Sequence, residues 1–581
     1  MRINFKLITS VVLVLLFCFN CGAQNSAEKI KLNQIGYYPS ASKIAVAETE
    51  TPGDFYIRQP GKASNLFTGK LSAPRKSEFS EKKMCIADFS SFTKEGSYIL
   101  VVPDLGQSYP FEIKKNVHDA VSKAAIKGFY YQRMSTALPE KFAGIWNRPF
   151  AHPDTKVLVH GSAASDKRPE GTELSSPRGW YDAGDYNKYI VNSGITMGTL
   201  LSAYEEFPAY YDKLKLDIPE SSNKLPDIID ETLWNLRWML TMQDPNDGGV
   251  YHKLTNAKFD GMVMPHEVST TRYVVQKGAG AALDFAAVMA QASRILKKFN
   301  KEIPGLADSC LNASKRAWTW ASQNPNVIYD QNAINKQFDP DIVTGAYGDR
   351  SFTDEFFWAA SELYATTKDD QYLKAIDQST IERASLPSWG NVDILGHYTL
   401  IRFEKELPQA TEVIGKVKQH LKNLADKLIE GVDQRSYMTV MGGSARDFIW
   451  GSSSVAANQA IILIETYRMT GDKKYLNYAL TNLDYLLGRN ATGYSFVTGH
   501  GDKTPMHIHH RQSEADGIAE PVPGLLSGGP NPGKQDRCTY ASSVPNEAFV
   551  DDVCSYASNE IAINWNAPLV YLVGAMEVTM K

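Results

Sequence analysis

Two aspartates lie close together in the segment GWYDAGDYNKY, in which Asp182 and Asp185 are separated only by an alanine and a glycine. A pair of acids can hold one water molecule, with one carboxylate orienting the water and the other accepting its proton. Residues 186–207 have helical spacing, so a helix N-cap is the structural alternative for one of the acids. The cap does not explain the second acid or the aromatic residues nearby, which can pack a core or stack on a ligand: Trp180, Tyr181, Tyr186 and Tyr189.

A separate acid, Glu560, lies near the C-terminus in the segment SNEIAINWNA. Apolar neighbours such as Ile561, Ile563 and Trp565 disfavour the charged form of a carboxyl group, which raises its pKa and suits it to proton donation. The alternative is an exposed first-turn glutamate that the dipole of the following helix stabilises. The segment alone does not separate these two roles.

A third polar segment, KTPMHIHHR, contains His507, His509, His510 and Arg511 within a region rich in glycine and proline. Imidazole groups at short spacing can hold a metal ion, but this spacing matches no zinc motif that we know. The same side chains can donate hydrogen bonds to the hydroxyl groups of a ligand. We therefore favour ligand binding over metal binding for this segment.

One further acid pair, Asp354 and Glu355, begins the helical segment FFWAASELYATT. Adjacent carboxylates offer the hard oxygen ligands that calcium prefers. Acids are also common in the first turn of a helix, because they interact favourably with the helix dipole. A calcium site is therefore one of two interpretations of this pair.

The elements that must position these groups fall into two parts. Residues 25–115 contain short apolar or alternating runs such as KIAVAE and SYILVV, separated by segments rich in Pro, Gly, Ser and Lys, which predicts a small β-sandwich. From residue 116 to residue 581 helical spacing dominates, as in DIIDETLWNLRWMLTMQ, and long loops join the helices. We expect a β-sandwich domain followed by a mainly α domain.

A weak internal repeat indicates how the helices are arranged. The segment ELYATTKDDQYL, which begins at Glu362, is similar to ETYRMTGDKKYL, which begins at Glu465, at an offset of 103 residues. Each copy is predicted to be a helix, a tight turn and the start of another helix. Repeated helical hairpins favour a solenoid or a closed helical toroid, and a toroid would gather its long loops at one end. Convergent turn chemistry in unrelated hairpins is the alternative.

The N-terminal segment predicts export. Arg2 and Lys6 precede an apolar run from Leu7 to Phe17, which is shorter than a membrane span of about 20 residues and is typical of a signal peptide. We place this signal at residues 1–23. It ends either at a small-residue cleavage site or at Cys21, which would then carry a lipid anchor as in bacterial lipoproteins. We expect a periplasmic, cell-surface or secreted protein.

Net charge and cysteine content limit the remaining classes. The net charge is −4 over 581 residues, which gives no argument for nucleic acid as a partner. Four cysteines lie outside the signal, too few for a disulfide scaffold and without CxxC spacing. Cys538 and Cys554 lie near each other in the chain. They either form a disulfide or are two unpaired buried thiols, and the sequence does not decide between these interpretations.

Together these segments resemble glycoside hydrolase family 9, the inverting endoglucanases. DAGDYNKY is similar to the family's motif for the attacking water, SFVTGHGDKTPMHIHHR to its histidine signature and FVDDVCSYASNEIAINWNA to its acid signature. NQIGYYPSASKIAV is similar to the immunoglobulin-like module that precedes the catalytic domain in one branch. The resemblance covers nearly the whole mature chain and implies an (α/α)6 barrel after an immunoglobulin-like β-sandwich.

The resemblance implies a role for each matching residue. Asp185 would be the general base, and Asp182 would help to hold the attacking water. Glu560 would be the general acid that protonates the leaving glycosidic oxygen. His509 and Arg511 would bind the sugar next to the scissile bond. Asp551 would support the acid loop, and Trp565 would contact the sugar next to the cut. Apart from the resemblance, we predict sugar contact by Trp180 and Tyr181 beside the aspartates, with packing against the rim of the barrel as the alternative.

The chain departs from the family pattern at three places. Many relatives with the immunoglobulin-like module hold zinc through two Cys and two His, but Met134 and Ala151 occupy the expected Cys positions here. His152 remains, but Gly179, Trp180 and Tyr181 supply no second histidine, so we predict that zinc is absent. Gly390 replaces one acid of the family's calcium site, and Trp565 stands where many relatives have Tyr. We expect no cofactor in the reaction itself.

These observations predict an exported endo-β-1,4-glucanase that acts on a cellulose-like chain, xyloglucan or mixed-linkage glucan. The alternative among enzymes is an exo-acting β-glucosidase or glucosaminidase on the same scaffold, which loops closing one end of the cleft would favour. A surface glycan-binding protein without catalysis is a second alternative. Such a protein would be expected to lack Asp185 or Glu560, and both are present.

Overall fold

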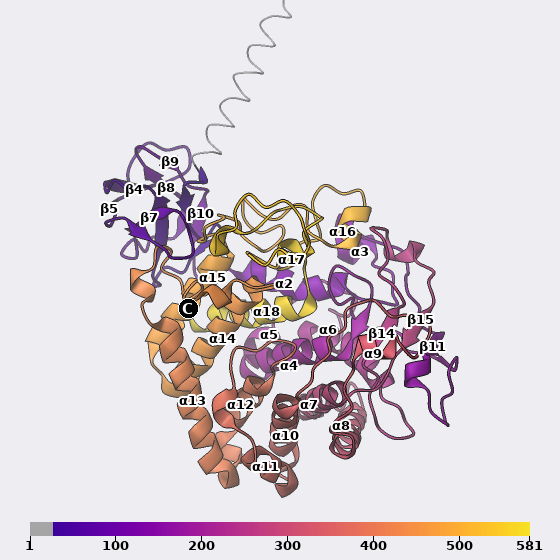
Figure 1. The fold of residues 1–581 in the computed structure, drawn as a ribbon. Helices are drawn as coiled ribbons and strands as arrows, with labels where there is room; N and C mark the ends of the chain where they lie inside the picture. Colours follow the sequence, from indigo (N-terminus) through magenta and orange to yellow (C-terminus); the bar gives the residue numbers. More distant parts are fainter. Residues whose placement is uncertain (1–26, 581) are drawn as a thin grey trace, which may run out of the picture.

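The computed structural model describes residues 27–580, and the predicted signal at residues 1–23, with Cys21, lies outside them. A β domain at the N-terminus is followed by a larger helical domain (Figure 1). The last strand of the β domain ends at Ile113 and the first long helix begins at Asp119.

Two sheets form the β domain. One has the order β1 (Ile30–Lys31), β3 (Ile44–Glu48), β7 (Lys83–Asp88) and β6 (Arg75–Lys76). The other has the order β2 (Gly36–Tyr37), β10 (Phe111–Ile113), β8 (Gly96–Val102), β4 (Asp54–Arg58) and β5 (Phe67–Lys70), with β9 (Gly106–Gln107) paired to β8. Alternate residues of the strands, such as Phe55 and Ile57, are buried between the sheets. The domain is a small sandwich.

Six helices, buried on most of their surface, line the centre of the helical domain: α4 (Ile190–Glu206), α7 (Ala279–Leu296), α10 (Thr353–Thr367), α12 (Asp393–Arg402), α14 (Ser452–Thr470) and α18 (Ile563–Thr579). Six helices, most with one exposed face, surround them: α2 (Asp119–Tyr131), α6 (Asp227–Thr241), α8 (Leu306–Gln323), α11 (Asp370–Asp377), α13 (Thr411–Ile429) and α15 (Lys473–Leu486). Short helices lie in the loops: α3 (Glu140–Ala143), α5 (Pro208–Tyr211), α9 (Gln331–Ile334), α16 (Arg511–Ala515) and α17 (Tyr556–Asn559). The predicted (α/α)6 barrel behind a β-sandwich is confirmed.

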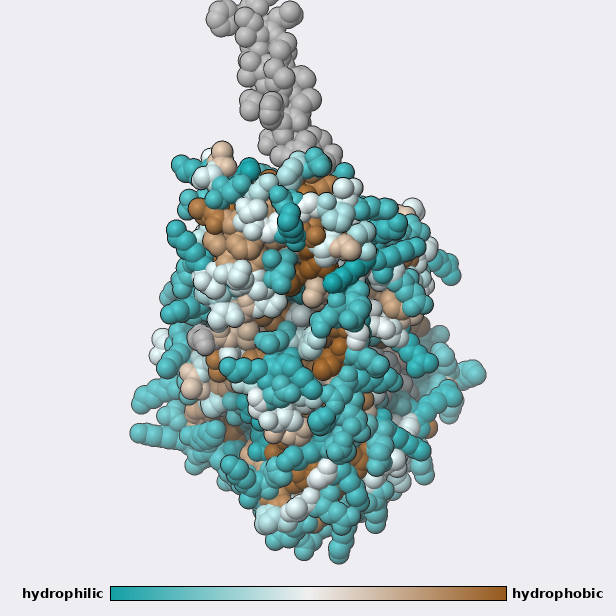
Figure 2. Space-filling view, turned by 90° about the vertical axis from the view of Figure 1, so that its left-hand side faces the viewer, coloured by the Kyte–Doolittle hydropathy of each residue, from teal (hydrophilic) through white to brown (hydrophobic). Residues whose placement is uncertain are grey.

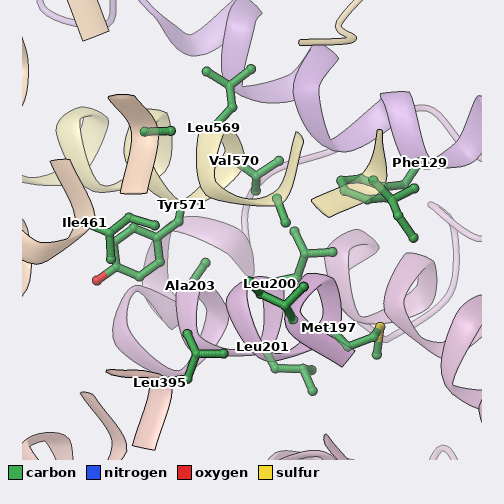
Figure 3. Close-up of a cluster of buried hydrophobic side chains, with 14 of the residues drawn as sticks. Phe129, Met197, Leu200, Leu201, Ala203, Leu395, Ile461, Leu569, Val570 and Tyr571 are labelled. Carbon is green, nitrogen blue, oxygen red and sulfur yellow. The ribbon is translucent and has the colours of Figure 1, made fainter. Parts of the chain in front are cut away.

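Close-packed apolar side chains join the inner helices. In Figure 3, Leu200 and Ala203 of α4 point toward α18, where Tyr571 lies beside Ile461 of α14, whereas Leu569 points away from α4. All five side chains are almost completely buried. A large-to-small change in such a core costs about 2–5 kcal/mol, so this packing fixes the helix ends that carry the loops.

The repeat of 103 residues corresponds to two equivalent hairpins. In one, the inner helix α10 is followed by the outer helix α11, and in the other α14 is followed by α15. Asp369 and Asp472 occupy equivalent N-cap positions, where their side chains accept hydrogen bonds from the backbone amides of Gln371 and Lys474. The similarity therefore reflects repeated inner–outer helix pairs.

Charged side chains and one tyrosine form a connected network that joins the six inner helices at one end of the barrel. We call this set of residues the charge network. Its members are Glu205 and Glu206 on α4, Arg294 on α7, Glu362 on α10, Arg402 on α12, Glu465 and Arg468 on α14 and Tyr571 on α18. Arg402 lies 2.9 Å from Glu205 and 3.7 Å from Glu465. Because α4 has 17 residues, Glu206 at its C-terminus lies roughly 25 Å from its first residue. The two aspartates precede that first residue, so the charge network lies at the opposite end of α4.

A third sheet lies beside the barrel and fixes the segment that follows the aspartates. Its order is β12 (Glu173–Leu174), β11 (Val157–Val159), β15 (Arg272–Val274), β14 (Lys253–Asn256) and β13 (Lys188–Tyr189). In the antiparallel pair of β13 and β14, Tyr189 lies opposite Lys253. The edge strand β13 therefore connects the two aspartates directly to the start of α4.

Cys538 and Cys554 form a disulfide, whereas Cys85 and Cys310 are buried free thiols. The question that the sequence left open for the first two cysteines is settled in favour of pairing. Among residues 27–580, no helix is both long enough and apolar enough to cross a bilayer. Figure 2 shows the face that lies on the left in Figure 1, where hydrophilic side chains cover most of the surface.

Candidate active site

Asp182 is held by two hydrogen-bond donors from different elements. Its Oδ1 accepts a hydrogen bond from Asn192 on α4 at 2.5 Å, and its Oδ2 accepts one from the Tyr347 hydroxyl at 2.7 Å. The carbonyl of Asp182 also accepts the amide hydrogen of Ile563, the first residue of α18. This aspartate therefore joins the starts of two neighbouring inner helices.

Asp185 is held by its own segment. Its Oδ2 accepts hydrogen bonds from the Asn187 side chain at 2.6 Å and from the Tyr189 hydroxyl at 3.0 Å. Neither hydrogen bond uses the other carboxylate oxygen, Oδ1. Asp185 is buried but lines a cleft.

Asp182 has a raised affinity for its proton. Burial, followed by the nearby charge of Asp185, raises the pKa of Asp182 to about 8. When two carboxyl groups lie close together, the site favours one negative charge over two. Asp182 therefore keeps a proton over much of the acidic range.

A close backbone approach brings the distant acid to this pair. A Cβ atom on Gly184 would lie 2.2 Å from the carbonyl oxygen of His509, so only glycine fits at position 184. His509 in turn forms a parallel bridge with Glu560. The bridge places Glu560 beside the aspartates, although Asp185 and Glu560 are far apart in the sequence.

Glu560 lies between α17 and α18 and is partly buried in the same cleft as the aspartates. Burial first, and then the charge of Asp185, raise the pKa of Glu560 well above its usual range, while Arg511 opposes this shift. A carboxyl group that keeps its proton near neutral pH can act as a general acid. The arrangement thus contains a proton donor and a proton acceptor in one cleft.

His509 is oriented by the loop that precedes Glu560. Its Nδ1 lies 2.6 Å from the carbonyl oxygen of Val553, which can accept a hydrogen bond only from a protonated Nδ1. Burial lowers the pKa of His509, which favours the neutral imidazole. This tautomer leaves Nε2 without a proton and able to accept a hydrogen bond.

Arg511 stabilises the backbone of the aspartate segment. Its guanidinium donates hydrogen bonds to the carbonyl oxygens of Gly184 at 2.7 Å and Asp260 at 2.9 Å. The side chain is buried and lies 5.5 Å from the ring of Phe259. These contacts support the turn between the aspartates, and sugar binding by Arg511 stays a prediction.

Asp551 links the histidine loop to the acid loop. Its carboxylate accepts hydrogen bonds from the amides of Met506 at 2.8 Å and His507 at 2.9 Å, and from the side chain of Asn559 at 2.9 Å. Asn559 directly precedes Glu560. These contacts suit the supporting role that the resemblance implies for Asp551.

The aromatic residues beside the aspartates require a correction. Trp180 and Tyr181 are each only 1% exposed. The indole of Trp180 donates a hydrogen bond to Glu231 and its ring packs on Phe129, while Tyr181 hydrogen-bonds to His152. The prediction that Trp180 and Tyr181 contact sugar is wrong, because both side chains point into the core.

Asp185 and Glu560 line a cleft of about 900 Å³. Trp565, the third aromatic residue predicted to contact sugar, also lines it. The sequence analysis did not identify the other large apolar residues along the cleft: Phe259, Tyr347, Trp389, Ile449 and Trp450. Tyr347 and Trp389 lie in long loops between helices, and loop aromatics near a predicted site are the only sequence signal that could have identified them.

A family model for glycosyl hydrolase family 9 matches residues 118–573. The chain is a member of this family. A model for the cellulase N-terminal ig-like domain matches residues 25–107, so both parts of the predicted resemblance are confirmed. This family 9 member is a glycoside hydrolase.

Curated relatives and solved structures cover the family 9 chain almost completely. A xyloglucan-specific endo-beta-1,4-glucanase of Bacteroides ovatus is 47% identical over 552 residues, which is 95% of this chain and 94% of that protein. Endoglucanase D of Acetivibrio thermocellus is 33% identical and matches 94% of this chain and 82% of that protein. A solved structure titled as a Bacteroides ovatus GH9 protein aligns with a TM-score of 0.91 and 45% identity, covering 96% of this chain and all of that one.

In this family 9 member, the position at which some relatives hold zinc offers a single imidazole. Met134 packs with Tyr181 and Tyr186, and Nδ1 of His152 lies 2.9 Å from the Tyr181 hydroxyl. Burial lowers the pKa of His152 to about 2. One imidazole among aromatic and thioether side chains does not fit a structural zinc ion, which takes four N or S ligands.

The predicted calcium pair fits a metal ion only in part. Asp354 accepts a hydrogen bond from the amide of Val392, and Glu355 is buried with Oε2 unpartnered. Burial, with the nearby charges of Asp354 and Asp284, raises the pKa of Glu355 well above its usual range. Within residues 27–580, Asp354 and Glu355 do not belong to a cluster of three or more side chains whose ligand atoms lie close enough together to hold one metal ion. Calcium binding by Asp354 and Glu355 stays a prediction.

Proposed function

We propose that this family 9 hydrolase is an inverting endo-β-1,4-glucanase whose preferred substrate is xyloglucan. The single observation that supports this most strongly is the pairing of a carboxyl group of raised pKa, Glu560, with a hydrogen-bonded aspartate pair in one cleft. Inverting glycosidases need such a donor and acceptor on opposite faces of the sugar, about 6.5–9.5 Å apart.

The reaction follows from the positions of these groups. Glu560 donates its proton to the glycosidic oxygen as the bond to the anomeric carbon breaks. Asp185 accepts a proton from a water molecule that attacks the same carbon from the opposite face. Asp182, which Asn192 and Tyr347 orient, hydrogen-bonds to that water. The new hydroxyl group has the inverted configuration, and no cofactor takes part.

The lining of the cleft supports a polymeric substrate. Phe259, Ile449 and Trp450 line it and are 48%, 49% and 42% exposed, respectively. The aromatic rings of Phe259 and Trp450 provide flat surfaces on which sugar rings stack, and Ile449 extends the apolar surface. A chain of several sugars would contact more of these side chains than a single terminal sugar would.

The small residues of the cleft support a branched glucan. One group of lining residues has little or no side chain: Gly345, Ala346, Gly348, Ser388, Gly390 and Gly451. Xyloglucan carries xylose branches on a β-1,4-glucan backbone, and such branches need lateral space. The relative that is 47% identical carries the name of a xyloglucan-specific enzyme, which agrees with this choice.

A panel of polymers tests the proposal. Equal backbone concentrations of xyloglucan, mixed-linkage glucan and carboxymethyl cellulose are digested, and viscosity and product size are followed together. We expect the highest kcat/KM on xyloglucan, with a fall in viscosity that precedes the release of small sugars. Release of one small product from the start would indicate the exo-acting alternative, and inactivity on all three polymers would contradict the proposed function.

We also propose that the protein is exported and that Cys21 carries a lipid anchor. The disulfide between Cys538 and Cys554 suits an oxidising compartment. A Cys21→Ala variant is expected to leave the membrane fraction and to appear in the soluble exported fraction. Unchanged membrane association of this variant would contradict the anchor.

A further inference from the structure

Lys253 is a completely buried lysine on β14, and its three ammonium hydrogens have three acceptors. Nζ lies 2.7 Å from Oε1 of Gln331, 2.9 Å from Oγ1 of Thr344 and 2.7 Å from the carbonyl oxygen of Gly345. An ammonium group has three N–H donors, whereas a neutral amine has two. The surroundings of Lys253 therefore match the charged form.

The ammonium lies under a tyrosine of the aspartate segment. Lys253 and Tyr189 are opposite each other in the pair of β14 and β13, and Nζ lies 5.5 Å from the centroid of the Tyr189 ring. The ring of Tyr329 lies at a similar distance, 5.6 Å. A desolvated cation over an aromatic face is attracted by the ring quadrupole. Lys253 thereby fixes the position of the Tyr189 ring.

The same lysine holds the chain that leads to a second tyrosine. Its acceptors Thr344 and Gly345 lie just before Tyr347, and the rings of Tyr189 and Tyr347 are in edge-to-face contact at 4.8 Å. Tyr189 donates to Asp185 and Tyr347 donates to Asp182. One buried cation thus lies behind both of the hydroxyl groups that orient the aspartate pair.

Charge strengthens this geometric role. Burial lowers the pKa of Lys253 to about 7, and the negative charge of Asp185 opposes that shift. The titratable side chains that face the ammonium are Asp185, Tyr189 and Tyr329, while His252 stacks on Tyr329 at 4.0 Å. The ammonium form predominates in mildly acidic solution, where it brings a positive charge close to the aspartate pair.

We propose that Lys253 is a positioning residue of the reaction, which acts through Tyr189 and Tyr347 to fix the geometry and charge of the two aspartates. The inference rests on the proposed function only in that Asp185 is the base. It assigns a role to a side chain that touches neither the substrate nor the attacking water. None of the sequence motifs described above drew attention to it.

A Lys253→Met variant tests the proposal on whichever β-glucan the unmodified enzyme cleaves best. We expect kcat to fall about 10–100-fold while KM changes less than about twofold, because orientation of the base matters more in the transition state than in binding. The acidic limb of the kcat–pH profile should move to higher pH, since a positive charge near Asp185 is lost. Lys253→Arg keeps the charge and is expected to recover part of kcat.

Lys43 provides a matched control in the β domain. It is also completely buried, and its Nζ donates to the carbonyl oxygens of Pro39 and Ala41, both at 2.8 Å. Lys43→Met should lower thermal stability without moving kcat or the acidic limb. Tyr189→Phe removes the hydroxyl group that donates to Asp185 but keeps the aromatic ring. It should show the same lower kcat and the same shift of the acidic limb, and it tests the proposal even if Lys253→Met does not fold.

The outcomes separate this inference from the proposed function. Inactivity of the unmodified enzyme on every β-glucan would contradict the proposed function. An active enzyme whose folded Lys253→Met variant keeps the original kcat and pH profile would overturn the positioning role. The same holds for Tyr189→Phe with unchanged kcat and acidic limb.

Discussion

At the scale of single residues, Glu560 as the acid and Asp185 as the base have different roles in the reaction. Substrates with different leaving groups can distinguish these roles. Glu560→Gln keeps the size of the side chain but removes the donated proton, so kcat on a glucan polymer should fall about 10²–10⁴-fold. The loss should be much smaller on an aryl cellobioside whose phenolate leaves without protonation. Asp185→Asn should be severely impaired on both substrates, because the water is not activated.

Steady-state kinetics on the two substrates measure this difference, and the thermal unfolding temperature shows whether each variant is folded. Near-normal turnover of Glu560→Gln on the unactivated polymer would show that another group is the acid. An equal loss on both substrates would show that Glu560 does more than donate a proton.

The raised pKa of Glu560 also predicts how stability depends on pH. A carboxyl group whose pKa is higher in the folded than in the unfolded protein stabilises the fold below its unfolded value, about 4.3. This stabilisation is lost as the pH rises through the folded value. The Glu560→Gln variant, which cannot ionise, should therefore have nearly the unmodified unfolding temperature at pH 4 and a higher one at pH 8. Calorimetry at the two pH values tests this, and equal unfolding temperatures at pH 8 would contradict it.

The sequence predicted the acidic groups of the site but not what orients them. Asp182, Asp185 and Glu560 stand in local patterns that restrict their chemistry. Tyr347, in contrast, lies 165 positions from Asp182, so no local pattern relates the two. Trp180 was misassigned because aromatic side chains near acids look alike in sequence whether they face a cleft or a core.

At the scale of helices, the charge network should stabilise the barrel without affecting the chemistry. Arg402→Met leaves Glu205 and Glu206 buried with one positive charge fewer, and such a loss typically costs about 3–5 kcal/mol. The variant should unfold at a clearly lower temperature, yet keep its kcat at a temperature where it is folded, because the network lies at the far end of α4.

A matched ion pair on the surface provides the control. Lys416 and Glu412 are exposed on α13 and lie 2.9 Å apart, so Lys416→Met should have little effect on the free energy of unfolding. Chemical denaturation compares the two variants. A similar loss of stability in both would contradict the role assigned to the charge network.

The repeat explains why the barrel itself was predictable. Equivalent helical hairpins imply a ring, and the equivalent residues Glu362 and Glu465 lie on inner helices of that ring. Their burial was not predictable, because a glutamate on a helix is usually exposed and only its distant partners, such as Arg294 and Arg402, make burial tolerable.

At the scale of the whole molecule, the β domain docks on the chain that leads to the histidine segment. The side chain of Gln34 donates to the carbonyl oxygen of Gly493 at 2.8 Å and accepts from the amides of Asp502 and Lys503, both at 2.9 Å. Gln34→Ala leaves buried groups unpaired and should lower the free energy of unfolding by about 1–3 kcal/mol. Gln59→Ala, at an exposed position of the same domain, should have little effect.

Denaturant titration followed by tryptophan fluorescence measures both variants. Equal stabilities of Gln34→Ala and the unmodified protein would show that this contact does not contribute to docking. The contact was not predictable from the sequence, because a single polar residue in the loop between β1 and β2 carries no sign of a partner more than 450 positions away.

The central claim is a single displacement in which Asp185 activates water and Glu560 protonates the leaving oxygen. Proton NMR of the anomeric signals in the first minutes of a glucan digest tests it most directly, before the free sugars equilibrate. Hydrolysis of a β-linkage by this mechanism predicts that the α-anomer appears first and converts slowly to the β-anomer. Initial formation of the β-anomer would require two displacements and would contradict the account.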